Sequence, residues 1–304
     1  MRDLALASGS FVAALAAALA AAAPAHATFP GRNGLIAFDT TDAEVSQIRT
    51  IAPNGRHLRQ LTHGKHRNTD PHWSRDGERI AWVSDQSGSP QIWAMRRDGS
   101  HKHAVTHDPA ADFQTPAWSP NGRRIVASRC SHLVFTCDIV SLRARDGKGM
   151  RVLIAGYWHH QQCSYSPDGR HLAYTSDEGG YDSRLWVADA SGHHRRHITA
   201  PVLTADGASW SPDGRRLLFT GDRHKGFTFS VAASGGRARR VPRFGEDTIF
   251  GTYSPDGRKL VVRRGYKGTR PPALVVADVN GRHQHELKAT RFDGLIHSDW
   301  SVAP

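Results

Sequence analysis

Short apolar stretches alternate with polar turns along almost the whole chain after residue 28. Typical stretches are residues 80–83 (IAWV), 185–188 (LWVA) and 274–277 (LVVA). They are rich in β-branched and aromatic residues, and Gly, Asp, Asn and Pro recur between them, as is typical of β-strands separated by tight turns. The pattern predicts an all-β protein made of short antiparallel strands.

One unit of this pattern is repeated. An aromatic residue followed by Ser precedes a turn of the Pro-Asp-Gly type, in which Pro fixes φ and Gly accepts the positive φ that closes a hairpin. We therefore interpret Asp168, Asp213 and Asp256 as turn formers rather than catalytic or metal-binding residues. Successive aromatic residues are 45, 47, 45, 43 and 47 positions apart, which is the length of a four-stranded propeller blade. They are Trp73, Trp118, Tyr165, Trp210, Tyr253 and Trp300.

The two ends of the sequence supply the parts of one further unit. Residues 30–38 (PGRNGLIAF) match the turn and second strand of the repeat, and residues 296–301 (IHSDWS) match its first strand. We therefore predict one domain over residues 28–304, a six-bladed β-propeller of four-stranded antiparallel blades. Its ring is expected to close by pairing of the C-terminal strand with the N-terminal blade.

Residues 1–27 have the pattern of a secretory signal peptide. Arg2 precedes an apolar, Ala-rich run over residues 4–23, and Ala25-His26-Ala27 forms a cleavage pattern of small residues. Cleavage after Ala27 would export the chain to the periplasm, the cell envelope or the medium, and would leave no stable transmembrane segment. The alternative is an uncleaved membrane anchor, because an apolar run of about 20 residues approaches the length that spans a bilayer.

The sequence has three cysteines, too few for a disulfide-dense scaffold, and none of them stands at Cys-x-x-Cys spacing. Cys130 and Cys137 flank residues 131–136, so their thiols face each other if this segment is a hairpin loop. In an oxidising compartment the two can form a disulfide. A free, inert thiol pair is the alternative.

The net charge of +12 is expected to be polarised along the propeller axis. In antiparallel blades the turns between the first and second strands, and between the third and fourth, lie at one end of the ring. This end, which we call the basic end, carries +17 when the fourth strands are included, and the remainder carries −5. Positive charge on outer strands discourages edge pairing. The alternative is docking on an anionic envelope polymer or phospholipid surface. An exported chain is not expected to bind nucleic acid.

The opposite end, which we call the loop-rich end, is formed by the connections between blades. Variable loops around a channel mouth are a usual place for ligand sites. Residues 157–162 (YWHHQQ) form the densest polar and aromatic patch of the sequence. We expect the partner-binding residues here to be Phe113, Tyr157, Trp158, His159, His160, Gln162, Phe244 and Phe292.

Three of the 19 histidines are candidates for a metal site in the channel. His72, His160 and His297 stand at or just before the innermost strands of three blades, with Asp70, Gln162 and Asp299 nearby. Imidazole together with carboxylate ligands suits a divalent transition metal. The alternative is that these rings simply pack between strands.

The repeat units, for example Trp210-Ser-Pro-Asp-Gly, are followed by strand ends such as Leu61-Thr62, Val105-Thr106 and Ile198-Thr199. In these features the chain resembles the TolB-type propeller repeat. The resemblance implies the propeller fold and a periplasmic or envelope setting. Similar repeats occur in propellers of prolyl-oligopeptidase-type proteases, and in sugar-polymer lyases whose channel metal is held by His and Gln. The chain departs from TolB in having no room for an α/β domain before the propeller, and it lacks the Gly-x-Ser-x-Gly motif of the proteases.

These features together predict an exported, non-catalytic TolB-like propeller that serves as a binding scaffold in the cell envelope. Its expected partner is an envelope protein, or an anionic envelope polymer or lipid surface. No catalytic residue and no cofactor are assigned. The alternative is a metal-dependent polysaccharide lyase or hydrolase with its site in the propeller channel, for which a divalent metal would be the cofactor.

Overall fold

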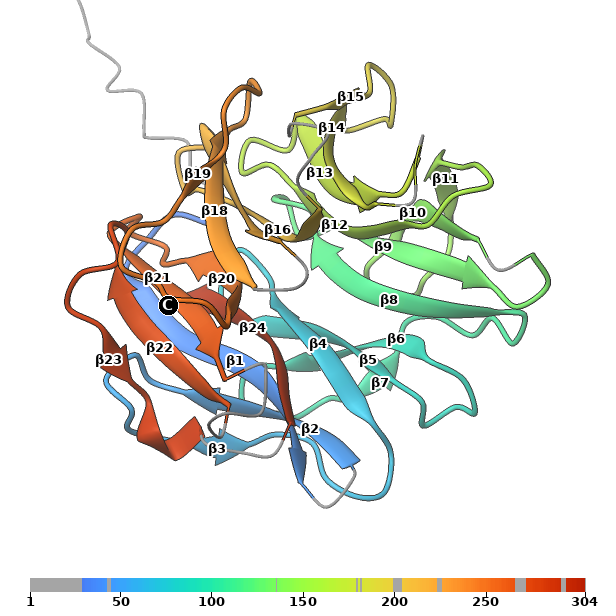
Figure 1. The fold of residues 1–304 in the computed structure, drawn as a ribbon. Helices are drawn as coiled ribbons and strands as arrows, with labels where there is room; N and C mark the ends of the chain where they lie inside the picture. The colour runs from blue at the N-terminus through green and yellow to red at the C-terminus, as the bar shows by residue number, and fades with distance from the viewer. Residues whose placement is uncertain are drawn as a thin grey trace, which may run out of the picture.

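Six four-stranded antiparallel sheets surround a central axis in the computed structural model (Figure 1). The structure describes residues 29–42, 45–134, 136–178, 180, 182–198, 204–222, 226–265, 272–290 and 294–303. The predicted signal peptide therefore lies outside the described residues. The all-β architecture, the six blades and their antiparallel pairing confirm the fold predicted from the repeats.

The innermost strand of each blade runs along the axis and ends at, or just after, the aromatic residue of the repeat. These strands are β24 (Gly294–Val302) in blade 1 and then β4 (Asn68–Trp73), β8 (Ala111–Trp118), β12 (His160–Tyr165), β16 (Ala205–Trp210) and β20 (Thr248–Tyr253) in blades 2 to 6. The second strands, in the same order, are β1 (Asn33–Asp42), β5 (Arg79–Ser84), β9 (Arg124–Ser131), β13 (His171–Ser176), β17 (Arg216–Gly221) and β21 (Lys259–Arg264).

The outer half of each blade is shorter than the inner half. The third strands are β2 (Val45–Ile51), β6 (Gln91–Arg96), β10 (Cys137–Arg143), β14 (Arg184–Asp189), β18 (Phe227–Ala232) and β22 (Ala273–Asp278). The outermost strands are β3 (Arg59–Gln60), β7 (His103–Ala104), β11 (Arg151–Ile154), β15 (Arg196–His197), β19 (Arg239–Arg240) and β23 (His285–Glu286). Four of these six short edge strands contain arginine, and short, charged edge strands protect a sheet against pairing with another chain.

The hydrophobic core lies between neighbouring blades. Trp73 and Ile80 of blade 2, for example, pack with Ile48 and Leu61 of blade 1 in one buried cluster. Burying a large aromatic residue at each interface contributes strongly to the cohesion of the ring. Among the described residues the helical structure is one 3-10 turn, η1 (Lys288–Thr290), and no helix is long and apolar enough to cross a membrane.

Blade 1 is completed by the two ends of the chain, as predicted. β24 pairs antiparallel with β1, and Trp300 lies opposite Ile36 in this register. The backbone N–H of Ala303 also donates to the carbonyl of Arg32 at 2.7 Å. The first and last strands of the propeller are thereby joined in one sheet, and the ring has no open join.

The repeated turns have the structural role that the sequence predicted for them. Ser166 Oγ donates to Asp168 Oδ1 at 2.6 Å, and the same pairing joins Ser211 to Asp213 at 2.5 Å. Each of these Ser Oγ atoms then accepts the N–H of the residue that starts the second strand. These aspartate side chains are therefore hydrogen-bonded within the turns that they close, which explains why an Asp occurs at the same position of successive repeats.

Candidate functional site

A ring of β-bulges surrounds the axis. In each of blades 2 to 6 the pairing of the innermost strand with the second strand shifts register at one point. The residue at this point has a positive φ between 48° and 63°, although four of the five residues are not glycine. Such backbone strain persists only where surrounding contacts hold it. The axial ring consists of these residues and the equivalent residue of β24, namely Asp70, Thr115, Gln162, Gly207, Phe250 and His297.

A cavity of about 150 Å³ lies on the axis next to this ring. Its walls come from the innermost strands of all six blades, from the axial ring to the aromatic residues near the basic end. Phe29, the first described residue, also lines the cavity and is buried there. The channel therefore combines apolar walls with a few polar groups, as small ligand sites do.

Two carboxylates and one imidazole meet on one side of the axial ring. His297 Nδ1 lies 2.5 Å from Asp70 Oδ1 and 3.8 Å from Asp39 Oδ2. Asp39 comes from β1 and is completely buried, whereas Asp70 and His297 are partly exposed to the channel. One ligand atom from each residue lies within 4.8 Å of the others, which is close enough to hold a metal ion.

The same carboxylates are already bound to backbone groups of the bulges. Asp39 Oδ1 accepts the N–H of His297 at 2.6 Å, and its Oδ2 accepts the N–H of Asp70 at 3.2 Å. Asp70 Oδ2 in turn accepts the N–H of Thr115 at 3.2 Å. Blades 1, 2 and 3 are thereby linked through two side chains, which satisfy buried N–H groups that the bulges remove from the sheet.

Opposite charges shift the protonation equilibria of this group. Burial by itself would lower the pKa of His297, but the carboxylates of Asp70 and Asp39 outweigh it and raise that pKa well above 6.5. Burial would likewise raise the pKa of Asp70, yet His297 and the Thr115 N–H hold it below its usual value. The raised pKa favours the imidazolium form of His297. A protonated imidazole has no lone pair for a metal.

The three predicted metal ligands are only partly brought together. His72 and His297 both line the axial cavity, and His72 Nδ1 lies 3.7 Å from Asp299 Oδ2. His160 does not line it; its buried ring packs edge-on against Tyr174 with 5.9 Å between ring centroids. Burial lowers the pKa of His160, which keeps the ring neutral. The physical reason for the separation is that His160 begins β12, two residues before the axial ring, whereas His72 follows the ring in β4.

Asp39 was not among the candidates from the sequence, although it is central to the site. In the register of each blade, the second-strand residue opposite the bulge is Asp39, Trp82, Ala127, Tyr174, Phe219 or Val262. Asp39 is the one acid in this apolar column. An acidic residue at the end of the apolar run of residues 35–38 (LIAF) was the available signal.

The third cysteine offers no nucleophile to the channel. Cys163 lies in the cavity wall and is buried. Burial raises the pKa of its thiol to about 12. Because the thiolate is the reactive form, this cysteine is chemically inert at neutral pH.

At the loop-rich end the predicted partner-binding residues fall into two groups. Tyr157 is 92% exposed and Trp158 is 38% exposed. His159 is also exposed and pairs with Asp177, with 3.0 Å between His159 Nδ1 and Asp177 Oδ2. Gln162 belongs to the axial ring, where its Oε1 accepts the N–H of Gly207 at 2.6 Å.

Two of the predicted partner-binding aromatic residues have no surface to offer a partner. Phe113 and Phe244 are buried, because each packs into a hydrophobic cluster between blades. His160, discussed above, is fully buried as well. Phe292 lies outside the described residues. Partner binding by the remaining exposed residues stays a prediction.

Cys130 and Cys137 are joined by a disulfide in the structure. They lie directly opposite each other where β9 and β10 pair, so the hairpin loop considered in the sequence analysis is present. The bond closes this hairpin beside the Tyr157–His159 segment, since the N–H of Cys137 donates to the carbonyl of Trp158 at 3.2 Å.

The fold and site define a six-bladed propeller with a cluster of two carboxyl groups and one imidazole beside its axis. A family model for the TolB β-propeller domain matches residues 5–202 and 157–295, and the chain belongs to this family. The resemblance seen in the repeats is thereby confirmed. The chain also matches curated proteins, but it spans less than half the length of each of the first three.

Solved structures show the same fold at low sequence identity. TolB from Acinetobacter baumannii superposes with a TM-score of 0.75 at 17% identity, over 89% of this chain and 67% of TolB. A chain of the nidogen–laminin complex gives 0.68 at 15% identity, over 88% and 97% of the two chains. Oligogalacturonate lyase in complex with manganese gives 0.61 at 15% identity, over 86% and 77%.

Proposed function

We propose that this protein is an exported, non-catalytic propeller that binds a protein partner in the cell envelope through its loop-rich end. The observation that carries the proposal is the exposure of the Tyr157 and Trp158 side chains on this end. Aromatic residues of this kind supply much of the binding energy of protein interfaces, and grouped exposed apolar side chains mark interaction surfaces.

The chemistry of the channel supports the non-catalytic part of the proposal. Asp39, Asp70 and His297 are bound to one another and to bulge N–H groups, so none of them is poised as a free acid or base. The Cys163 thiol is held in its protonated form. A general base needs a pKa near the working pH and access to a substrate proton. The arrangement is better suited to holding blades together than to turning over a substrate.

The comparisons support a binding role in general terms. A propeller chain of similar fold occurs in the nidogen–laminin complex, and the family match is to the TolB propeller domain. The resemblance to TolB implies an envelope location, in agreement with the signal pattern of residues 1–27. An anionic polymer or lipid surface facing the basic end remains the alternative partner.

Location and processing can be tested in the organism that makes the protein. The chain, tagged at its C-terminus, is fractionated and its N-terminus is sequenced. We expect the envelope or medium fraction to contain a chain that begins at Thr28. A matched variant, Ala25→Lys/Ala27→Lys, is expected to remain uncleaved because signal peptidase requires small residues there. Recovery of the unprocessed wild-type chain from the cytoplasm would refute export.

A metal-dependent lyase is the second candidate, because the ligand atoms of Asp39, Asp70 and His297 lie near one another on the channel wall. A solved lyase with this fold carries manganese. The test measures the metal content of the purified chain and its activity on polygalacturonate. The scaffold proposal predicts neither stoichiometric metal nor turnover. If the wild-type chain contains metal and is active, and the His297→Ala variant loses both the metal and the activity, the lyase is favoured.

A further inference from the structure

The disulfide-closed hairpin carries two exposed aliphatic side chains. Leu133 is 85% exposed and Val134 is 61% exposed at its tip. Tyr157 and Trp158 are exposed on the neighbouring connection between β11 and β12. We call these four side chains the apolar prominence. A soluble surface normally scatters its large apolar residues singly, so two exposed apolar pairs on neighbouring segments indicate an interaction site.

The two segments of the prominence are fixed to each other. The backbone of Cys137 forms a parallel bridge with His159, and its N–H donates to the Trp158 carbonyl at 3.2 Å. Cys137 is also bonded to Cys130 across the base of the hairpin. One residue therefore ties the hairpin to the adjoining loop and to its own partner strand.

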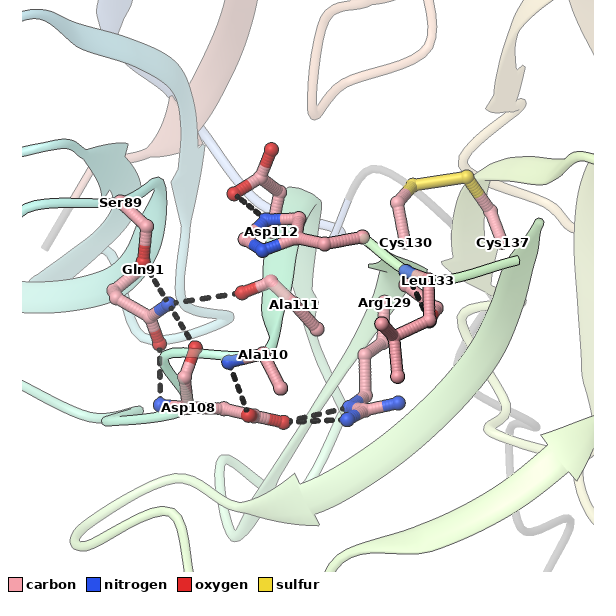
Figure 2. Close-up of polar contacts among 12 residues, drawn as sticks. Ser89, Gln91, Asp108, Ala110, Ala111, Asp112, Arg129, Cys130, Leu133 and Cys137 are labelled. Carbon is pink, nitrogen blue, oxygen red and sulfur yellow. Dashed lines mark hydrogen bonds and ion pairs between the residues drawn. A yellow bond between two sulfur atoms is a disulfide. The ribbon is translucent and has the colours of Figure 1, made fainter. Parts of the chain in front are cut away.

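The base of the hairpin is held by a polar framework (Figure 2). Arg129 donates from Nε and Nη2 to Asp108 Oδ2 at 2.8 and 2.6 Å. Gln91 Nε2 donates to the carbonyls of Asp108 and Ala111 at 2.9 and 3.1 Å. A tip presented on a fixed base loses little conformational entropy when it binds, which favours affinity.

The two segments that carry the prominence contain no Lys or Arg that could bind an anionic partner. Residues 131–136 and 156–160 contain no Lys or Arg. Three of the nearby acids are paired, Asp108 with Arg129, Asp112 with His132 at 2.8 Å and Asp177 with His159 at 3.0 Å. Docking on anionic lipids or polymers depends on clustered Lys and Arg. The charge pattern therefore fits an uncharged apolar partner surface.

We propose that the apolar prominence inserts into an uncharged apolar groove of a protein partner. The inference rests on the proposed binding function and names the surface and the chemistry of the partner. A bilayer is the less suitable occupant. Four partly exposed side chains bury about as much apolar surface as a single acyl chain, whose membrane association constant is only on the order of 10⁴ M⁻¹. A groove can enclose Leu133 and Trp158 from several sides.

Site-specific photo-cross-linking of the full chain tests this in the organism that makes the protein. p-Benzoylphenylalanine replaces Leu133 in one variant and Val279 in the control, since Val279 is also exposed but lies in the β22–β23 turn at the basic end. We expect a discrete protein adduct from position 133 and none from position 279. Adding Tyr157→Ser/Trp158→Ser to the first variant is expected to abolish the adduct.

Mass spectrometry then identifies the partner protein in the adduct. The partner is purified separately, without the cross-link, and titrated against the wild-type chain. Leu133→Ser/Val134→Ser is expected to raise Kd at least about tenfold, with little change between about 0.05 and 0.5 M salt, because the contact is apolar. An equal Kd, or strongly salt-dependent binding, overturns the inference. A protein adduct from position 279 alone would refute both the prominence and the assignment of binding to the loop-rich end, although a binding role at the basic end would remain. No protein adduct from either position would refute protein binding altogether.

Lipid docking is the remaining outcome. Vesicles of phosphatidylcholine and phosphatidylglycerol are sedimented with the wild-type chain and with Leu133→Ser/Val134→Ser. We expect no pelleting of either chain through this end. Pelleting of the wild type that the double variant loses would assign the prominence to a membrane and overturn the protein groove.

Discussion

The axial ring and the apolar prominence use side chains in opposite ways. Behind the ring, Asp39 of β1 is completely buried, and both of its oxygens accept backbone N–H groups of ring residues. In the prominence, Leu133 and Tyr157 make their apolar surface available to solvent. The bulges require hydrogen-bond acceptors near the ring, because each bulge leaves a backbone N–H group without a partner in the sheet. Loops carry no such obligation, so this propeller can vary its binding chemistry there at little structural cost.

The largest expected effect concerns closure of the ring. Deleting residues 295–304 removes most of β24, including Trp300 in the core between blades 1 and 6. We expect the melting temperature, followed by circular dichroism, to fall by more than about 10 °C, because several kcal/mol of burial are lost. Removing Pro304 alone is the control and should change little. A truncated chain that melts like the full one would contradict closure by this strand.

Removing the charge of Asp39, beside the ring, should destabilise the fold more than removing the charge of Asp177 at the loop-rich end. Asp39→Asn leaves His297 without one buried counter-charge, and we expect the free energy of unfolding to fall by about 3 kcal/mol. Asp177→Asn breaks the exposed pair with His159 and should cost less than about 1 kcal/mol. Urea titrations measure both. Equal losses would mean that the ring pair is no stronger than a surface pair.

The pH dependence of stability should carry the signature of the ring. The pKa of His297 is raised, so its contribution is complete below about pH 6.5 and is lost as the pH rises through the higher folded-state value. The pKa of Asp70 is lowered, so its contribution is present above about pH 3.8 and is lost as the pH falls through the lower folded-state value. The urea concentration at the unfolding midpoint should therefore be highest between about pH 3.8 and pH 6.5 and should decline at lower and at higher pH. His297→Asn should flatten the alkaline decline, and an unchanged profile would contradict the ion pair.

The smallest expected effect is that of the prominence on the free chain. Leu133→Ser/Val134→Ser alters exposed side chains that contribute little to packing, so the free energy of unfolding should change by less than about 0.5 kcal/mol. Thermal and urea unfolding of the wild type and the variant measure it. A larger loss would indicate that the tip stabilises the fold, and the contrast with the ring would then disappear.

The fold was predictable because its information is local and repeated. The aromatic residue, the Ser and the Asp-Gly turn act within a few residues of one another, as the Ser166–Asp168 contact illustrates. The completion of blade 1 was predictable because the missing half of a repeat at one end matched the surplus half at the other. Both inferences needed only the spacing along the chain.

The site was less predictable because it depends on which side of a strand a residue faces and on distant partners. Asp39 and His297 are 258 positions apart, and no local pattern joins them. Phe113 and Phe244 were assigned to the connections between blades, yet Phe113 lies within β8 and both rings pack into the core between blades. His160 was grouped with His72 because both lie in innermost strands. His160 comes before the bulge of its strand and packs against Tyr174, whereas His72 comes after the bulge of its own strand and lines the cavity.

The pairing of β24 with β1 also sets an order for folding. β1 leaves the ribosome long before β24, so blade 1 can be completed only after the whole propeller has been synthesised. The hairpin that Cys130 and Cys137 close has a sequence separation of 7 and can form as soon as β10 follows β9. The propeller therefore seals its channel last, when the contact between Asp39 and His297 becomes available.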